Sequence, residues 1–176
     1  MLRDIDIKYR YSTGSKDTPI QFFTDTLSNS VNFDLGLGFF SSASINVLAT
    51  GFARFISNGG KMRMYINQNL SDEVVKAISS MPTEMLEEKL IADVAAMTSL
   101  LSKRDKHFFN CLSYLICSHR IDIKIVVPKA GGIAHQKFGI LTDANNDKVC
   151  FSGSLNFTAS ALLRNIETID CYTSWE

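Results

Sequence analysis

A histidine and a lysine two residues apart are the side chains of this sequence best suited to chemistry on a phosphate diester. His135 and Lys137 lie in the apolar stretch 133–141, which predicts a β-strand. Side chains two residues apart on a strand project from the same face. Lys137 would then neutralise a phosphoryl oxygen while the neutral imidazole of His135 attacks phosphorus and forms a covalent intermediate. A second group must protonate the departing oxygen, and a base must later activate water.

A second group of polar residues follows the next apolar strand, residues 149–152. Ser154 stands 17 residues after Lys137, and Asn156 follows two residues later. Both side chains can donate hydrogen bonds to phosphate oxygens. Gly153, just before them, permits close approach of the backbone to a ligand. Preorganised donors around developing charge are usually the largest catalytic contribution, so the two groups together predict an active site.

Each group taken alone has a simpler interpretation. An isolated H-x-K fits an exposed strand, and an isolated G-S-x-N fits a turn, because Gly, Ser and Asn all favour turns. Their order on two apolar strands, joined by the polar residues 144–147, favours the active site instead. The other two histidines, His107 and His119, stand beside basic residues near expected helix ends, where a cation is favourable without any catalytic role.

The two groups resemble the signature of the phospholipase D superfamily, H-x-K-x-x-x-x-D followed by G-S-x-N. Farther along, residues 165–167 read N-x-E and are similar to an element of its nuclease-like members. The resemblance implies a catalytic set of His135, Lys137, Asn156 and Glu167, and a phosphate-binding set of Lys137, Ser154 and Asn156. In this scheme His135 is the nucleophile, and Glu167 holds its ring in the required tautomer. A solvated strand residue is the plainer interpretation of Glu167.

The aspartate of the signature is displaced in this chain. The family spacing falls on Thr142, and the acidic residue is Asp143, one position later. The resemblance gives this aspartate a structural role or one that supports the catalytic residues from behind. A turn residue that ends the strand is the alternative interpretation of Asp143.

Longer phrases resemble the nuclease modules at the front of bacterial DEAD/DEAH-type helicases and restriction endonucleases. These phrases are residues 151–162, 38–43 and 58–63, so the resemblance covers most of the chain. It implies DNA as substrate, a helicase motor domain in the full-length protein, and a role in restriction. We therefore expect residues 1–176 to form one phospholipase D-like domain of a longer chain.

The sequence holds a single copy of H-x-K, although double displacement at phosphorus needs both a nucleophile and an acid. Superfamily members with one copy pair two chains so that the motifs face each other. The resemblance thus implies a two-fold homodimer, a common assembly, in which the two His135 residues approach each other across the axis.

Composition limits the other possibilities. The 176 residues suffice for one domain with its own core, and 45% hydrophobic with 20% charged residues is typical of a globular protein. Eighteen basic and 18 acidic residues cancel, which excludes a uniformly basic surface but allows a local basic groove. The four cysteines form no C-x-x-C pair and show no zinc spacing, so we expect no metal and no cofactor. An early run of charges and short apolar segments predict a cytoplasmic protein that does not insert into membranes.

The pattern along the chain predicts an α/β fold. Strands are expected at 33–39, 61–67, 121–127, 133–141, 149–152 and 167–172, and helices at 19–27, 42–56, from 71, from 83 to about 104, at 108–118 and at 158–163. Strands separated by helices favour a mixed, largely parallel sheet with helices on both faces.

Three functions are compatible with these residues. A metal-independent nuclease acting on DNA through a phosphohistidine explains both motifs and is the leading hypothesis. A lipid phosphodiesterase uses the same chemistry, but the sequence has no basic amphipathic helix for an interface. A catalytically weak DNA-binding and dimerisation module of a helicase is the third, and the displaced Asp143 favours it.

Overall fold

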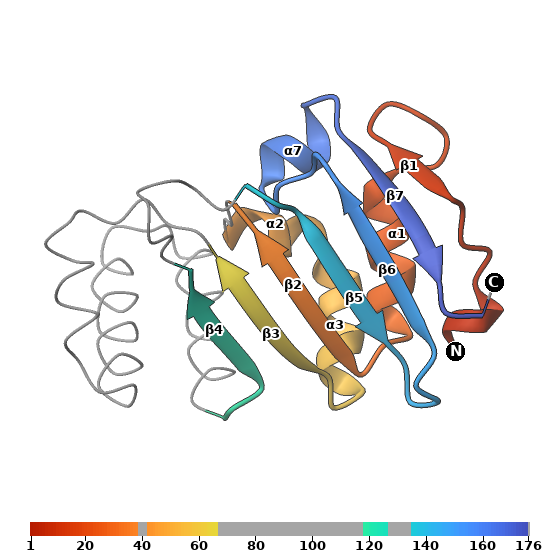
Figure 1. The fold of residues 1–176 in the computed structure, drawn as a ribbon, viewed down its shortest axis with the longest axis vertical. Helices are drawn as coiled ribbons and strands as arrows, with labels where there is room; N and C mark the ends of the chain where they lie inside the picture. Colours follow the sequence, from red (N-terminus) through yellow and green to blue (C-terminus); the bar gives the residue numbers. More distant parts are fainter. Residues whose placement is uncertain (39–41, 67–117, 127–134, 176) are drawn as a thin grey trace, which may run out of the picture.

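A single seven-stranded sheet organises the protein, with strand order β1-β7-β6-β5-β2-β3-β4 (Figure 1). The computed structural model describes residues 1–38, 42–66, 118–126 and 135–175. The strands are β1 (Arg10–Ser12), β2 (Asn32–Leu37), β3 (Lys61–Ile66), β4 (Ile121–Ile125), β5 (Phe138–Thr142), β6 (Lys148–Gly153) and β7 (Thr168–Thr173). The predicted α/β fold with a mixed sheet is therefore confirmed.

The sheet is less parallel than the sequence suggested. Among the described strands only β2–β3 and β3–β4 are parallel, whereas β2–β5, β5–β6, β6–β7 and β1–β7 are antiparallel. The turn between β5 and β6 is short, and such a turn can join only antiparallel strands. β1 was not predicted, because its three residues lie in a polar, turn-rich stretch.

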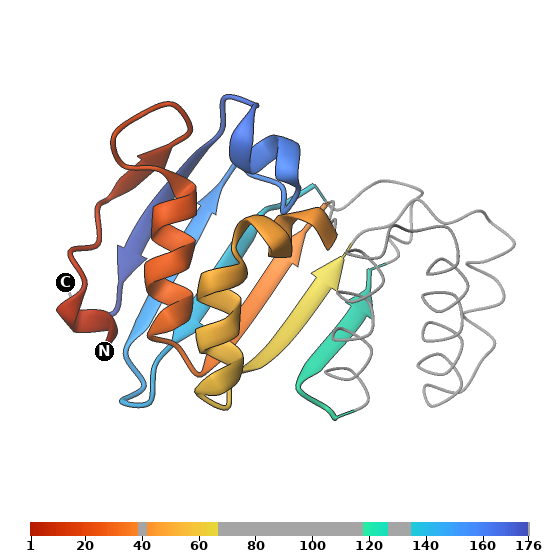
Figure 2. The ribbon, with the colours of Figure 1, turned by 180° about the vertical axis from the view of Figure 1, so that it is seen from behind.

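The described helices cover one face of the sheet (Figure 2). They are α1 (Pro19–Ser28), α2 (Ser42–Val47), α3 (Ala49–Ser57) and α7 (Ala159–Leu163), preceded by the 3₁₀ helix η1 (Leu2–Asp4). The single helix predicted over 42–56 is divided between α2 and α3. The helices predicted from 71 to 118, which would supply the second layer, lie outside the described residues.

α1 begins where the sequence indicates. The Thr18 hydroxyl accepts a hydrogen bond from the Gln21 N–H at 3.3 Å, and Pro19 occupies the first turn, where its missing N–H costs nothing. This helix packs Phe22 and Phe23 against the sheet, both at most 1% exposed. Phe23 meets Phe151 of β6 edge to face, with ring centroids 5.0 Å apart.

Alternate residues of β2 face the helices. Phe33, Leu35 and Leu37 of β2 are all buried under the helices. Gly36 lies on the opposite face, where a Cβ would come within 2.5 Å of the Phe138 ring of β5. The bare glycine thus accommodates an aromatic ring of the neighbouring strand.

Candidate active site

The two predicted motifs meet at one edge of the sheet. There β6 ends and β5 and β7 begin, beside α7 (Figure 1). The backbone N–H of Gly153 donates to the carbonyl of Lys137 at 3.2 Å. This bond continues the β5–β6 pairing past the end of β5 and brings G-S-x-N beside H-x-K.

His135 and Lys137 are in contact, although the reason given by the sequence is wrong. β5 begins at Phe138, so both residues precede the strand and strand alternation does not align them. β2 pairs with β5 only as far as Phe138, which leaves the preceding segment without a strand partner on that side. The contact arises because the Lys137 Nζ turns back and donates to the His135 carbonyl at 2.9 Å.

The lysine ammonium lies against the imidazole. The Nζ atom of Lys137 is 3.0 Å from Nδ1 and 3.1 Å from Nε2 of His135. The two ring nitrogens direct their lone pairs away from each other. An ammonium that is almost equally far from both nitrogens therefore does not lie on the lone-pair axis of either one. Lys137 is buried, at 7% exposure, whereas His135 is exposed. A buried cation thus lies beside an imidazole that a substrate can reach.

Ser154 lies just beyond β6 and links it to β7. Its N–H donates to the Thr168 carbonyl at 3.0 Å, and its hydroxyl accepts from the Thr168 N–H at 3.2 Å. The same hydroxyl donates to the carboxylate of Glu167. Gly153 makes this close approach possible, because a Cβ there would lie 2.1 Å from the Thr168 carbonyl oxygen.

Glu167 lies just before β7 and accepts hydrogen bonds from two side chains of the site. One carboxylate oxygen accepts from Ser154, and the other accepts from the Asn165 side-chain amide at 3.3 Å. Within the described part of the chain, His135 is not among the hydrogen-bond partners of Glu167. The orienting role predicted for Glu167 stays a prediction, and it requires the carboxylate to change partners.

Asn156 is held by its neighbours in the sequence. Leu155 and Phe157 are buried, at 1% and 0% exposure, and anchor the segment on both sides of the half-buried Asn156. The Asn156 carbonyl accepts from the Thr158 N–H at 2.9 Å. The Thr158 hydroxyl in turn caps α7 by accepting from the Ala161 N–H at 3.1 Å. These contacts keep G-S-x-N rigid between β6 and α7.

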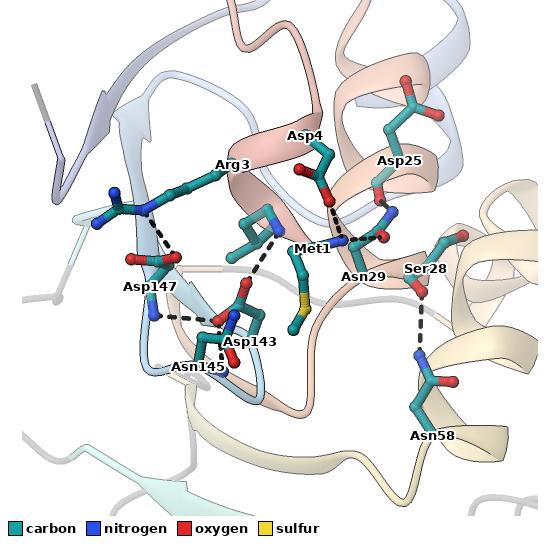
Figure 3. A network of polar contacts seen from close by, with 11 residues as sticks. Met1, Arg3, Asp4, Asp25, Ser28, Asn29, Asn58, Asp143, Asn145 and Asp147 are labelled. Atoms are coloured by element: carbon teal, nitrogen blue, oxygen red, sulfur yellow. Dashed lines mark hydrogen bonds and ion pairs between the residues drawn. The ribbon is translucent and has the colours of Figure 1, made fainter.

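Asp143 lies at the opposite end of β5 (Figure 3). It is six positions from Lys137 in the sequence, or about 20 Å along an extended strand. Its buried carboxylate accepts three backbone N–H groups, from Leu2 at 2.9 Å, Asn145 at 2.9 Å and Asp147 at 3.0 Å. These contacts define the β5–β6 turn and attach the N-terminal segment to it. The displaced aspartate is thus the turn residue of the alternative interpretation, away from both motifs.

Thr13 lies beside the site and was not predicted from the sequence. Thr13, in the turn after β1, bonds to Asn165 and Glu167. A threonine in a polar turn has no distinguishing pattern, and only the β1–β7 pairing brings it there. Asn165 had a signal, since it begins the N-x-E element.

The basic residues on the open face of the sheet are largely neutralised. Arg63 donates to the Asp34 carboxylate at 2.6 Å, and Arg10 donates to Asp170 at 2.6 Å. The Arg10 guanidinium lowers the pKa of the Asp170 carboxyl, chiefly through this hydrogen bond. Neither pair offers an unpaired charge to phosphate, whereas the Lys137 ammonium lies against the His135 ring.

The described ranges contain neither a cluster of metal ligands nor a membrane-spanning helix. Residues 1–38, 42–66, 118–126 and 135–175 contain no cluster of three or more His, Cys, Asp or Glu side chains that could hold a metal ion. No helix in that same part of the chain is long and apolar enough to cross a membrane.

Three solved structures share this fold. NucT from Helicobacter pylori matches with a TM-score of 0.50 at 14% identity, over 94% of this chain and 84% of NucT. Yeast tyrosyl-DNA phosphodiesterase matches with a TM-score of 0.52 at 10% identity, over 93% of this chain and 31% of that one. Polyphosphate kinase from Porphyromonas gingivalis gives 0.51 at 10% identity, over 94% and 23%.

The phospholipase D-like fold predicted from the sequence is confirmed by these matches. Identities this low establish a shared fold, and activity must be argued from the site. The chain spans less than a third of the phosphodiesterase and of the kinase. No protein-family model and no curated protein matches the sequence.

Proposed function

We propose that this protein is a metal-independent phosphodiesterase that cleaves DNA through a covalent phosphohistidine. The observation that carries the proposal is the buried Lys137 ammonium lying 3.0 Å from the ring of the exposed His135. A substrate phosphate that reached this imidazole would meet a fixed positive charge beside it. The folds of NucT and of a tyrosyl-DNA phosphodiesterase support DNA as the substrate.

The proposed reaction has two displacements at phosphorus. A neutral ring nitrogen of His135 attacks the phosphate diester and forms a P–N bond. The P–O bond to the leaving alcohol breaks, and the imidazolium of a second histidine donates its proton to the departing oxygen. Water then attacks phosphorus and the P–N bond breaks. The second imidazole, now neutral, takes the water proton, and both histidines return to their starting states.

Phosphate binding falls to three side chains in this proposal. Lys137 compensates the phosphate charge, as a metal ion would elsewhere, and Ser154 and Asn156 donate hydrogen bonds. Ser154 now donates to Glu167, so it must leave that carboxylate before it can donate to phosphate. The released Glu167 is then available to accept from the N–H of His135, the role predicted for it.

The second imidazole comes from a second chain in our proposal. The sequence has one H-x-K; His119 belongs to the turn before β4, and His107, outside the described residues, stands beside Lys106 near an expected helix end. A two-fold homodimer would give each His135 a partner, one as nucleophile and the other as acid. The helicase motor, the restriction role and the cytoplasmic location rest on the sequence alone.

Cleavage of labelled single- and double-stranded DNA in excess EDTA tests the proposal. We expect cleavage to continue in the chelator and to vanish in His135→Ala. His119→Asn is the matched control, because His119 is exposed and asparagine tolerates its positive φ of 53°. Cleavage that needs a divalent cation, or that survives in His135→Ala, contradicts the mechanism.

The silent DNA-binding module is the alternative to this proposal. It rests on the displaced aspartate, and in this structure Asp143 accepts the N–H groups of Leu2 and Asp147 in the β5–β6 turn. DNA binding without cleavage, under every condition of the EDTA experiment, would favour this alternative. Cleavage of a phospholipid, but not of DNA, would favour the lipid phosphodiesterase.

A further inference from the structure

Thr13 makes a concentrated set of hydrogen bonds to the segment that carries Glu167. The Thr13 hydroxyl donates to the Asn165 carbonyl at 2.6 Å and accepts from the Glu167 N–H at 2.8 Å. The Thr13 backbone N–H donates to the Glu167 carbonyl at 3.0 Å. One residue thus satisfies three backbone groups on a segment 152 to 154 positions away in the sequence.

The segment has little other support on that side. Between α7 and β7 the side chains are largely open to solvent, and Ile166 is 92% exposed. Apolar burial therefore does not fix the path of residues 164–166. On the other side, Ser154 bonds to Thr168 and to the Glu167 carboxylate. Glu167 is held between G-S-x-N and the turn that contains Thr13.

We propose that Thr13 is a positioning residue for the active site, acting through the backbone of Glu167. This inference rests on the proposed function, since Glu167 matters only if it serves His135 during cleavage. The hydroxyl contributes what a hydrophobic residue cannot, because it donates to one backbone group while accepting from another. Misplacement of a catalytic group by about 1 Å costs up to about 100-fold in rate, so a loosened Glu167 backbone should be visible in kcat.

Thr13→Val is the test variant, because it keeps the shape and the backbone N–H but removes the hydroxyl. We expect kcat to fall about tenfold, with KM for DNA changed less than about twofold. Thr13→Ser restores the hydroxyl and should recover kcat. Ser15→Ala is the matched control, since the Ser15 hydroxyl bonds only within the same turn, to the carbonyls of Ser12 and Asp17.

Two further measurements separate positioning from loss of stability. If Thr13 acts through Glu167, removing either group affects the same step. We therefore expect kcat of Thr13→Val to lie between that of the parent protein and that of Glu167→Gln, and the double variant should lose little more than Glu167→Gln. The Glu167 amide should also lose protection from hydrogen exchange.

The possible outcomes are distinct. Thr13→Val with the kcat of Ser15→Ala overturns the positioning role and leaves the proposed function standing. Losses in Thr13→Val and Glu167→Gln that multiply in the double variant also overturn it, since the two residues would then act independently. If the parent protein shows no His135-dependent cleavage, both the proposed function and the positioning role fail.

Discussion

Lys137 is an ammonium that the fold has taken out of water without a matching carboxylate among its described partners. Its hydrogen bonds go to the ring and carbonyl of His135. Burial of a charge is costly unless it is paired, so this residue lowers the stability of the folded protein. Such a cost is typical of active sites, where a strained or unpaired group is retained for function.

Lys137→Met should therefore separate stability from activity. Methionine fills similar volume without a charge, so we expect the melting temperature to stay the same or rise, because a desolvated ammonium is removed. Cleavage should fall by about 100-fold or more, because the charge that compensates phosphate is lost. Thermal unfolding and cleavage rates measured on the same preparation test both parts. A destabilised Lys137→Met with normal specific activity would contradict this view of the residue.

At the scale of elements, the sequence predicts strands that are marked by local apolar patterns. It does not predict features that depend on pairing with distant residues. β6 and β7 were predicted within one residue of their observed bounds, because apolar runs bounded by polar turns are local signals. The start of β5 was missed, since residues 133–141 read as one strand whereas the pairing with β2 ends at Phe138. β1 and the Thr13 contacts were missed because both depend on pairing with β7, over 150 residues away in the sequence.

The β5–β6 turn supplies an element-scale prediction. Asp143→Ala removes the acceptor for three backbone N–H groups, those of Leu2 and Asp147 buried and that of Asn145 partly buried, which should cost about 2–4 kcal/mol of unfolding free energy. The folded fraction should keep near-normal kcat, because the turn is about 20 Å from Lys137 along β5. Denaturant titration and active-site-normalised kinetics measure the two effects.

Asp4→Asn is the control for the turn, since Asp4 is exposed and its carboxylate accepts from the N-terminal amine of Met1. Its ion pair is of the solvent-exposed kind that contributes little, so stability should change by less than about 1 kcal/mol. Full folding with lost cleavage in Asp143→Ala would instead assign the aspartate a catalytic role.

At the scale of the whole molecule, the site has one nucleophile and no second imidazole beside it among the described residues. The described histidines are His119, in the turn before β4, and His135, at the edge where β5 begins. With this arrangement, the end of the sheet that carries His135 would pair with the same surface of a second chain. The proposed two-fold dimer would then contain one complete site, shared by the two chains, and only when both chains carry His135.

Mixing experiments measure this requirement directly. If wild-type and His135→Ala chains are unfolded together and refolded, a random dimer has both histidines with a probability equal to the square of the wild-type fraction. We therefore expect activity per total protein to fall with the square of that fraction when both imidazoles take part. A protein whose site is complete within one chain would lose activity in direct proportion instead. The size of the mixed species, measured by sedimentation at the assay concentration, must be that of a dimer. A linear loss with a monomer in sedimentation would overturn the shared site while leaving His135 as the nucleophile.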